Sequence, residues 1–596
     1  PNAPIDPSTG ISIPTIAVAT DGGVSVITDS GTVVDFNDSL GSTRPVSSVI
    51  IRGNDITTFN VYNGTVQQFF DALLSTADST NDCKYNYTFG GGGGSTENIT
   101  AILRNTTGIN HIIENGKTFK DLYAANPDGL SIVHDGFDRV HSTNSFSIFD
   151  SKVAYVTSDY NTGYMHGDIK GAFLSDTTVE SLTANTNLAT SATDQGTNRL
   201  SSHTYDDGDT SWQMVDNAGS SNGYINIGLK GLTIGQSYFI SMTWDNNATL
   251  DSGYEHRIAH LNGTAGENAT DFIHWNKTNG SSETLTGVFI AQSVNDDDLI
   301  IYCNAITLNV SNFNVRAVDD EDRSINNKGL AVYGTVTKSA VATGAELVAY
   351  SGFSASNYLQ QPYNSNLNFG TGDFSFMAWI YPTNDNVGGI ISRGSNGVYG
   401  PYAFNYSATI ITLVCSSDWN ESNDGGSWGT IIQTASGGAP HNVWSHVVAV
   451  KSGTTAYVYI NGVLKGTDTS AVNPKVPTSN FIPTMIGVER RPLTGVIGRP
   501  FPGSLALVRA SASAPSAEQV KKMYEDEKVL FQENAKATLY GSSDAVTALA
   551  YDEVTDQLHV GTSSGRSDFQ GLRRINNTTT AVTTAISAHD EFIIEQ

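Results

Sequence analysis

The sequence predicts an all-β protein in which β-propeller blades are interrupted by two β-sandwiches, with one amphipathic helix near residues 516–534. Three observations indicate this fold class. Apolar and polar residues alternate with period two in many short runs, most strictly over residues 374–381, as in a β-strand. Gly and Pro separate these runs at short intervals, which is typical of sandwiches. A strand–turn–strand unit also recurs along the chain, as it does in propeller blades.

The propeller is predicted from both ends of the chain. An apolar strand that ends in a polar turn occurs at residues 16–23, 153–159 and 558–565. At roughly 40–45 residues per blade, residues 1–178 would supply about four blades, and residues 536–596 one or more. We therefore expect one propeller into which the middle of the chain is inserted. Two unrelated β segments are the alternative.

The sandwich predicted at residues 321–515 contains, in order, FSFMAWIYP, GGIISRG, WSHVVAV, AYVYINGVLKG, IGVE and FPGSLALVRA. Asn461-Gly462 within it is a strong hairpin signal. The order of these segments resembles laminin-G/concanavalin-like lectin domains. The resemblance implies a concanavalin-type sandwich that binds glycans or proteins and is usually non-catalytic.

The sandwich predicted at residues 179–320 contains GLTIGQSYFISMTW, TGVFIA, DLIIYC and VSNFNVR. This order resembles the jelly-roll carbohydrate-binding modules, which often hold a structural calcium ion. Asn312 stands where the resemblance leads us to expect an acidic residue, which departs from the pattern. The acidic run at residues 319–323 marks the joint between the two sandwiches.

A connector helix is predicted at residues 516–535, where Ser516 and Gln519 form a capping box. Its apolar residues fall on one face, so we expect the helix to dock on the flank of a sandwich. The segment SAEQVKKMYEDEKVLFQENAKATLYGSSDAVTALAYD resembles tail-associated structural proteins of marine bacteriophages. The segment at residues 329–381 resembles the same proteins. That resemblance implies a virion tail appendage that acts outside the cell. Its partners would be a host cell-surface glycan or protein, other virion tail proteins and further copies in a homo-oligomer.

Composition excludes several classes of partner. The chain has 32 Lys and Arg against 59 Asp and Glu, a net charge of −27, so it should repel nucleic acids and anionic membranes. No apolar run approaches the roughly 18 residues needed to span a bilayer, so no membrane insertion is expected. Cys83, Cys303 and Cys415 are too few and too far apart for a disulfide framework or a zinc site. A chain that begins at Pro1 is expected to be a fragment or a processed product.

No glycosidase signature is present in the lectin-like sandwich. Residues 352–514 lack the Glu-x-Asp-x-x-Glu pattern of the glycosidases that share this fold. The segment at residues 255–260 is similar to the zinc motif His-Glu-x-x-His, but Arg257 stands where the general base should be. The protein is therefore not expected to be an enzyme.

Aromatic residues in polar loops are the candidate glycan contacts. An exposed ring can stack on a sugar, while neighbouring Asn and Asp side chains accept hydrogen bonds from the hydroxyl groups of the sugar. Packing at a subunit contact and packing within the loop are the alternatives. The candidates are Trp419 and Trp428 with Asp418 and Asn420, Tyr399 and Tyr402, and His274 with Trp275.

Acidic turns are the candidate calcium sites, since calcium takes hard oxygen ligands. Solvated loops are the alternative. The candidates are Asp206, Asp207 and Asp209, Asp296 and Asp298, and, in the lectin-like sandwich, Asp385 and Asp424.

The sequence thus predicts a non-enzymatic tail-appendage protein of a bacteriophage that attaches to the host surface through lectin-like modules. A tail nozzle or hub protein with decorative sandwiches is one alternative. A secreted bacterial adhesin or a polysaccharide depolymerase is another.

Overall fold

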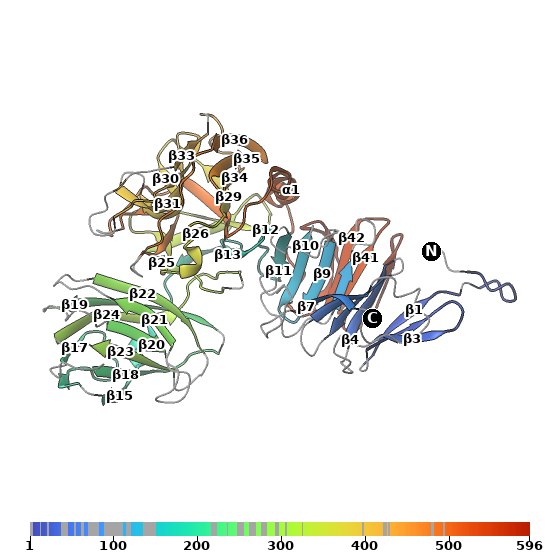
Figure 1. Ribbon diagram of the computed structural model, residues 1–596, viewed down its shortest axis with the longest axis horizontal. Helices are drawn as coiled ribbons and strands as arrows, with labels where there is room; N and C mark the ends of the chain where they lie inside the picture. Colours follow the sequence, from blue (N-terminus) through green and yellow to red (C-terminus); the bar gives the residue numbers. More distant parts are fainter. Residues whose placement is uncertain are drawn as a thin grey trace.

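The computed structural model is nearly all-β, as the sequence predicts (Figure 1). Among the described residues, α1 (Ala517–Glu527) is the one α-helix, and no helix is long and apolar enough to cross a membrane. Short 3-10 turns occur at η4 (Leu188–Ser191), η5 (Ser365–Leu367) and η6 (Lys528–Phe531). The structure describes residues 4–11, 13–20, 23–36, 46–52, 55–60, 65–69, 83–88, 111–114, 121–134, 151–198, 200–215, 223–234, 236–246, 256–260, 270–275, 283–291, 297–303, 307–324, 326–395, 398–420, 426, 430–434, 436–477, 482–492 and 495–596.

The jelly-roll sandwich consists of two five-stranded antiparallel sheets, ordered β15-β18-β23-β20-β21 and β16-β17-β24-β19-β22. Residues of both sheets form one core, in which Ile225 and Ile301 of the first sheet meet Trp244 and Val310 of the second. The strands are β15 (Thr193–Asn198), β16 (Ser202–His203), β17 (Trp212–Val215), β18 (Gly223–Leu229), β19 (Ser237–Asn246), β20 (His256–His260), β21 (Thr270–Trp275), β22 (Glu283–Ile290), β23 (Asp297–Cys303) and β24 (Thr307–Ala317).

The lectin sandwich lies above the jelly roll in Figure 1. One sheet is ordered β14-β26-β27-β40-β29-β34-β35-β36, with β13 also paired to β40, and the other β25-β28-β37-β30-β31-β32-β33. Its strands are β13 (Ile169–Phe173), β14 (Glu180–Thr183), β25 (Ala331–Tyr333), β26 (Thr335–Ala340), β27 (Val348–Ser351), β28 (Tyr358–Gln361), β29 (Phe374–Pro382), β30 (Gly388–Ser395), β31 (Val398–Ser407), β32 (Ile410–Cys415), β33 (Thr430–Gln433), β34 (Ser445–Ser452), β35 (Thr455–Ile460), β36 (Val463–Asp468), β37 (Thr484–Ile486), β38 (Glu489–Arg490), β39 (Ile497–Gly498) and β40 (Gly503–Ser511).

The start of the lectin sandwich differs from the predicted boundaries. β13 pairs with β40 and β14 pairs with β26, so residues 169–183 belong to a sheet whose other strands lie beyond residue 330. Pairing of this kind rests on backbone hydrogen bonds, which leave no side-chain pattern in the sequence. The jelly roll is therefore an insertion between β14 and β25 of the lectin sandwich.

β29 is buried on both faces, and its alternation positions the helix. Phe376 and Ile380 point into the core between the two sheets, whereas Met377 and Trp379 point out of the sandwich into a second core. Val520 and Met523 of α1 enter that second core, so the helix docks on the sandwich flank. The predicted capping box is present, with Ser516 and Gln519 bonded to each other's backbone N–H. The predicted hairpin also forms, with φ of 50° at Asn461 and 74° at Gly462.

A row of antiparallel sheets occupies the right-hand side of Figure 1. It comprises β1-β2-β3, β4-β5-β6-β7, β12-β11-β10-β9-β8, β41-β42-β43-β44 and the hairpin β45-β46. The strands are β1 (Ile16–Thr20), β2 (Gly23–Ile27), β3 (Val33–Phe36), β4 (Val46–Arg52), β5 (Asp55–Asn60), β6 (Thr65–Phe69), β7 (Cys83–Thr88), β8 (His111–Glu114), β9 (Asp121–Asn126), β10 (Gly129–His134), β11 (Lys152–Val156), β12 (Met165–His166), β41 (Val546–Asp552), β42 (Gln557–Thr562), β43 (Gly565–Gln570), β44 (Arg573–Asn577), β45 (Ile586–His589) and β46 (Phe592–Glu595).

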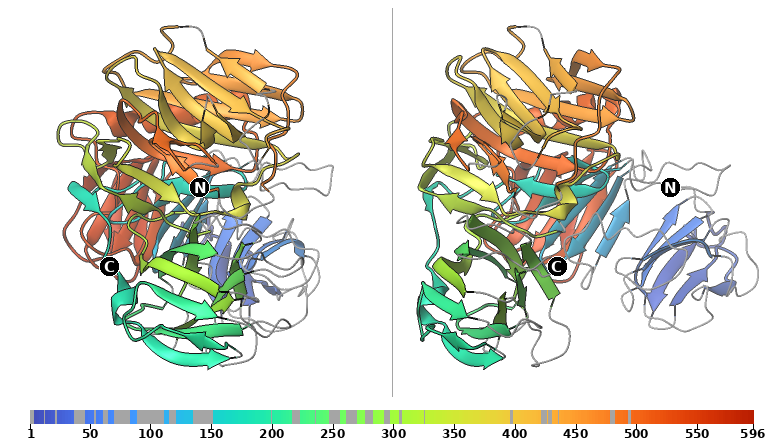
Figure 2. Two further views of the ribbon diagram at one scale, coloured as in Figure 1. Left: turned by 90° about the vertical axis from the view of Figure 1, so that its left-hand side faces the viewer. Right: turned by 60° about the vertical axis from the view of Figure 1, so that its left-hand side comes forward.

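Successive sheets of this row contact one another through their first strands: β1 with β4, β4 with β8, β8 with β41, and β41 with β45. Figure 2 shows the C-terminal strands (red) next to the β8–β12 sheet, which lies far from them in the sequence. The ring of Tyr123 stacks on that of Tyr551 across this contact, with centroids 5.6 Å apart. The described sheets do not close into a ring, so the interrupted propeller stays a prediction.

Candidate functional site

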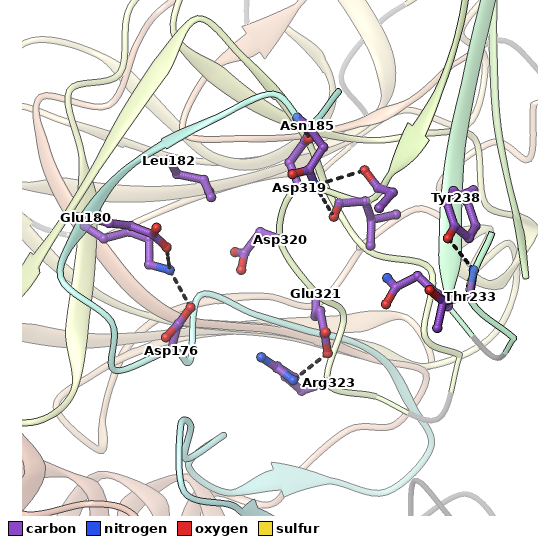
Figure 3. A pocket seen from close by; sticks show the side chains of 14 residues that line it. Asp176, Glu180, Leu182, Asn185, Thr233, Tyr238, Asp319, Asp320, Glu321 and Arg323 are labelled. Atoms are coloured by element: carbon purple, nitrogen blue, oxygen red, sulfur yellow. Dashed lines mark hydrogen bonds and ion pairs between the residues drawn. The ribbon is translucent and has the colours of Figure 1, made fainter. Parts of the chain in front are cut away.

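A pocket of about 360 Å³ lies at the joint between the two sandwiches (Figure 3). Four segments line it: the chain around β14, the turn that precedes β19, the linker between β24 and β25, and Lys338 on β26. The linker is the acidic run at residues 319–323 that the sequence places at the joint. The pocket therefore exists only because the jelly roll is inserted next to this edge of the lectin sheet.

Two aspartates of the linker are structural. Asp319 accepts hydrogen bonds from Arg316 Nε at 3.0 Å and from the Val332 N–H at 2.8 Å. Asp322 accepts from the N–H groups of Ala172 at 3.0 Å and Ser324 at 2.9 Å. These carboxylates join the linker to both sandwiches, which fixes the shape of the pocket wall.

Asp320 differs from its two neighbours. Its backbone pairs with Leu330, and the residue is only 8% exposed, yet its Oδ2 has no hydrogen-bond partner. In Figure 3 its carboxylate lies at the centre of the pocket, apart from the marked interactions. Burial raises the pKa of Asp320 to about 7, with Lys338 opposing the shift and Asp176 adding to it. A carboxyl group that titrates near neutrality inside a pocket is a candidate for a ligand contact.

The cations of the pocket already have partners. Lys338 Nζ is bonded to Asp176 and lies 2.6 Å from Glu180 Oε1. Arg323 is paired with Glu321, and its guanidinium lies over the ring of Tyr160, 3.7 Å from the centroid. Neither cation is bonded to Asp320, so the pocket keeps an unpaired carboxylate although Lys and Arg line it.

Two of the predicted aromatic contacts are corrected by the structure. Trp419 and Tyr402 are each only 1% exposed, so neither ring can stack on a sugar. Tyr402 belongs to β31, where Tyr402, Phe404 and Tyr406 alternate into the sandwich core. The loop of Trp419 is held inward, because Lys475 Nζ donates to the Trp419 carbonyl at 2.9 Å. Both rings are therefore buried within the chain, and Tyr402 packs in the sandwich core, which was not among the alternatives.

The other predicted glycan contacts are distributed over separate places. Asp418 and Asn420 are exposed beside Trp419, and Asp418 accepts a hydrogen bond from the Ser416 hydroxyl at 3.0 Å. Tyr399 lies on β31, and His274 and Trp275 lie on β21 of the jelly roll; their side chains are outside the described part of the structure, as is Trp428. These residues stay predictions; of the described ones, neither Asp418 nor Asn420 lines the pocket at the joint.

The predicted calcium turn at Asp206, Asp207 and Asp209 uses its carboxylates locally. Asp207 accepts from the Asp194 N–H at 2.8 Å, Asp209 from the Asp206 N–H at 3.0 Å, and Asp206 from the Asp207 N–H at 2.8 Å. Within the part of the chain that is described, no group of three or more His, Cys, Asp or Glu side chains could hold a metal ion. Asp385 is exposed; Asp298 lies on β23 with its side chain undescribed, and Asp296 and Asp424 lie outside the described residues.

Comparison with known proteins identifies the second sandwich. Residues 353–521 match the family model Laminin_G_3, the concanavalin A-like lectin/glucanases superfamily. No curated protein matches the sequence.

Several solved structures are similar at low scores. The CBM40 of Ruminococcus gnavus IT-sialidase bound to alpha2,3 sialyllactose is 13% identical, over 26% of this chain and 84% of that chain, with a TM-score of 0.22. Domain 4 of AbnA, a GH43 extracellular arabinanase from Geobacillus stearothermophilus, in complex with arabinotriose, is 17% identical, over 33% of this chain and 88% of that chain, with a TM-score of 0.24. The botulinum neurotoxin type G receptor binding domain is 14% identical, over 44% of this chain and 61% of that chain, with a TM-score of 0.27. Likenesses this weak carry no argument on function, and the family match alone supports the conclusion that the chain carries a concanavalin A-like lectin domain.

Proposed function

We propose that the protein is a non-enzymatic tail-appendage component of a bacteriophage that attaches to a host-surface glycan through its lectin-like modules. The observation that carries this proposal is the concanavalin A-like lectin domain at residues 353–521, with a polar pocket of about 360 Å³ at its edge. A pocket of this size is at the lower end of the range for small-ligand sites, roughly 300–1,000 Å³. Several weak sites would gain avidity in an oligomer, without any new contact.

A glycan array tests this proposal. The full chain, with and without calcium, should bind a subset of bacterial surface glycans and leave them intact. A signal that disappears on chelation would assign calcium to the site, and a calcium-independent signal would remove calcium from the proposal. Release of reducing ends from a bound polysaccharide would favour a depolymerase, and the absence of any binding would refute attachment through glycans.

One observation favours the second candidate, a tail nozzle or hub protein. On the hairpin β45-β46, Phe592 and Ile594 are 82% and 72% exposed. They lie opposite His589 and Ser587, so all four side chains share the exposed face of the hairpin. Two large apolar side chains on the free end of a row of stacked sheets are typical of a surface that packs against another subunit. We propose that a further copy of the chain covers this face.

The double substitution Phe592→Ser and Ile594→Ser should weaken self-association at least about a hundredfold. Burial of each side chain contributes about 1.5–3 kcal/mol, and the lower sum for the two, about 3 kcal/mol, corresponds to that factor. Sedimentation velocity over a range of protein concentrations measures the effect. The matched control is Val463→Ser, an exposed apolar residue on the lectin sandwich, 53% exposed. Equal sedimentation of the wild type and both variants would contradict the contact.

A further inference from the structure

The pocket at the joint presents an excess of negative charge. Five carboxylates line it, against the two cations Arg323 and Lys338, and a third cation, Arg316, is bonded to Asp319. Arg323 and Lys338 are already paired within the pocket wall. A ligand that brings a positive charge would therefore be attracted, whereas an acidic sugar would be repelled. The five carboxylates are those of Asp176, Glu180, Asp319, Asp320 and Glu321.

The same pocket presents acceptors more than donors. Both hydrogens of the Asn185 amide are used, because its Nδ2 lies 3.3 Å from the Ala317 carbonyl and 3.0 Å from the Val318 carbonyl. The Thr233 N–H is bonded to the Tyr238 hydroxyl oxygen at 2.8 Å, and Gln236 Nε2 donates to the Ser237 carbonyl at 3.3 Å, so donors on that wall are partly used. Asp320 Oδ2 is a buried acceptor that makes no hydrogen bond, although the Tyr350 hydroxyl faces its carboxylate. An unpaired buried polar group is costly, so a donor-rich ligand gains most by meeting it.

We propose that this pocket binds the ammonium group of an amino sugar, a hexosamine whose amine is free rather than acetylated, with Asp320 as the counter-ion. This assignment rests on the proposed attachment to glycans and names the class of sugar. The ammonium donates to Asp320, and the sugar hydroxyls are left to acceptors such as the carbonyl oxygen of Asn185. A charge-assisted hydrogen bond of this kind is about twice as strong as a neutral one.

Other occupants fit the pocket less well. A neutral sugar would leave the carboxylate of Asp320 without a cation, and an acetylated amine brings no charge. A divalent metal would need several ligands at one point, but among the described residues no cluster of three acidic or metal-binding side chains is suitably placed. The volume of about 360 Å³ favours a single sugar ring over a longer buried chain.

Calorimetric titration of the full chain with glucosamine, N-acetylglucosamine and glucose tests the proposal. Glucosamine should bind at least tenfold more tightly than the other two sugars. Asp320→Asn should abolish this preference while the variant stays folded, as its melting curve will show. The control is Asp29→Asn, an exposed turn residue far from the pocket in the sequence, which should leave the preference unchanged.

Three results would overturn the assignment: equal binding of the three sugars, a preference that survives Asp320→Asn, or displacement of glucosamine by calcium. The glycan array that tests the proposed function separates failure of the Asp320 assignment from failure of attachment. If the chain binds glycans that lack a free amine but shows no response to glucosamine, attachment stands and the role of Asp320 is refuted. If glucosamine binds through Asp320 but no surface glycan does, the pocket stands and attachment is refuted.

Discussion

Replacing Glu527 with Gln should lower the free energy of unfolding by about 3–5 kcal/mol, the usual effect of breaking a buried ion pair. Glu527, at the end of α1, is completely buried. Its Oε2 accepts from Arg509 Nη2 at 3.0 Å and from the Trp379 indole N–H at 2.6 Å. Its Oε1 accepts from the Tyr164 N–H at 2.8 Å. One carboxylate therefore connects the helix, the outer face of the lectin sandwich and the segment that precedes β12.

The charge of Glu527, more than its shape, should account for this effect. Burial alone would raise the pKa of Glu527, but the guanidinium of Arg509 and the hydrogen bonds it receives outweigh burial and hold the pKa below its usual value. A lowered pKa in the folded state contributes stability that is present above the unfolded-state pKa and is lost as the pH falls. Gln keeps the size of the side chain but leaves the Arg509 cation buried without a counter-ion.

Urea denaturation at neutral pH measures this difference. Glu525→Gln on the same helix is the matched control, because Glu525 is 43% exposed and pairs at the surface with Lys528. An exposed pair is worth at most about 1 kcal/mol, so the control should change stability little. Similar effects of the two substitutions would show that Glu527 does not hold the segments together.

Residue patterns predicted the strands well where a single strand carries its own signal. The strict alternation over 374–381 gave the two faces of β29, and the capping box gave the first turn of α1. The same reasoning could have placed Tyr402 in the core, since it alternates with Phe404 along β31. The polar loops near Tyr402 suggest an exposed ring instead, but polar neighbours do not show whether a loop folds back on the sandwich. The predicted glycan contact of Trp419 is wrong for the same reason, because its side chain is buried.

The pocket could not be predicted in the same way. Its walls come from segments around residues 180, 236, 320 and 338, which meet only because β14 pairs with β26 across the inserted jelly roll. The acidic run at 319–323 was visible in the sequence as a joint. The partners that hydrogen-bond its aspartates include Arg316 and Ala172, and the sequence does not show which aspartate each of them reaches. A residue left without a partner cannot be identified from composition.

Replacing Asp320 with Asn should have little effect on stability at about pH 4 and should raise the free energy of unfolding at about pH 8 by up to about 4 kcal/mol. Burial raises the pKa of Asp320 from 3.8 to about 7, and each unit is worth about 1.4 kcal/mol. Between these values the folded chain keeps a proton that the unfolded chain has released, so stability falls as the pH rises through this window. The groups that face Asp320 are Lys338 on β26, Tyr350 on β27, Asp176 and Arg323.

Denaturation of the wild type and the variant at several pH values measures how the difference in their free energies of unfolding grows with pH. Asp29→Asn should run parallel to the wild type throughout, and a constant difference between Asp320→Asn and the wild type would show that Asp320 titrates normally. A carboxylate that destabilises the empty fold is expected where binding, rather than folding, requires it. A cationic ligand relieves this destabilisation, because it stabilises only the folded state. Saturating glucosamine at about pH 7 should therefore raise the stability of the wild type and leave that of the variant unchanged.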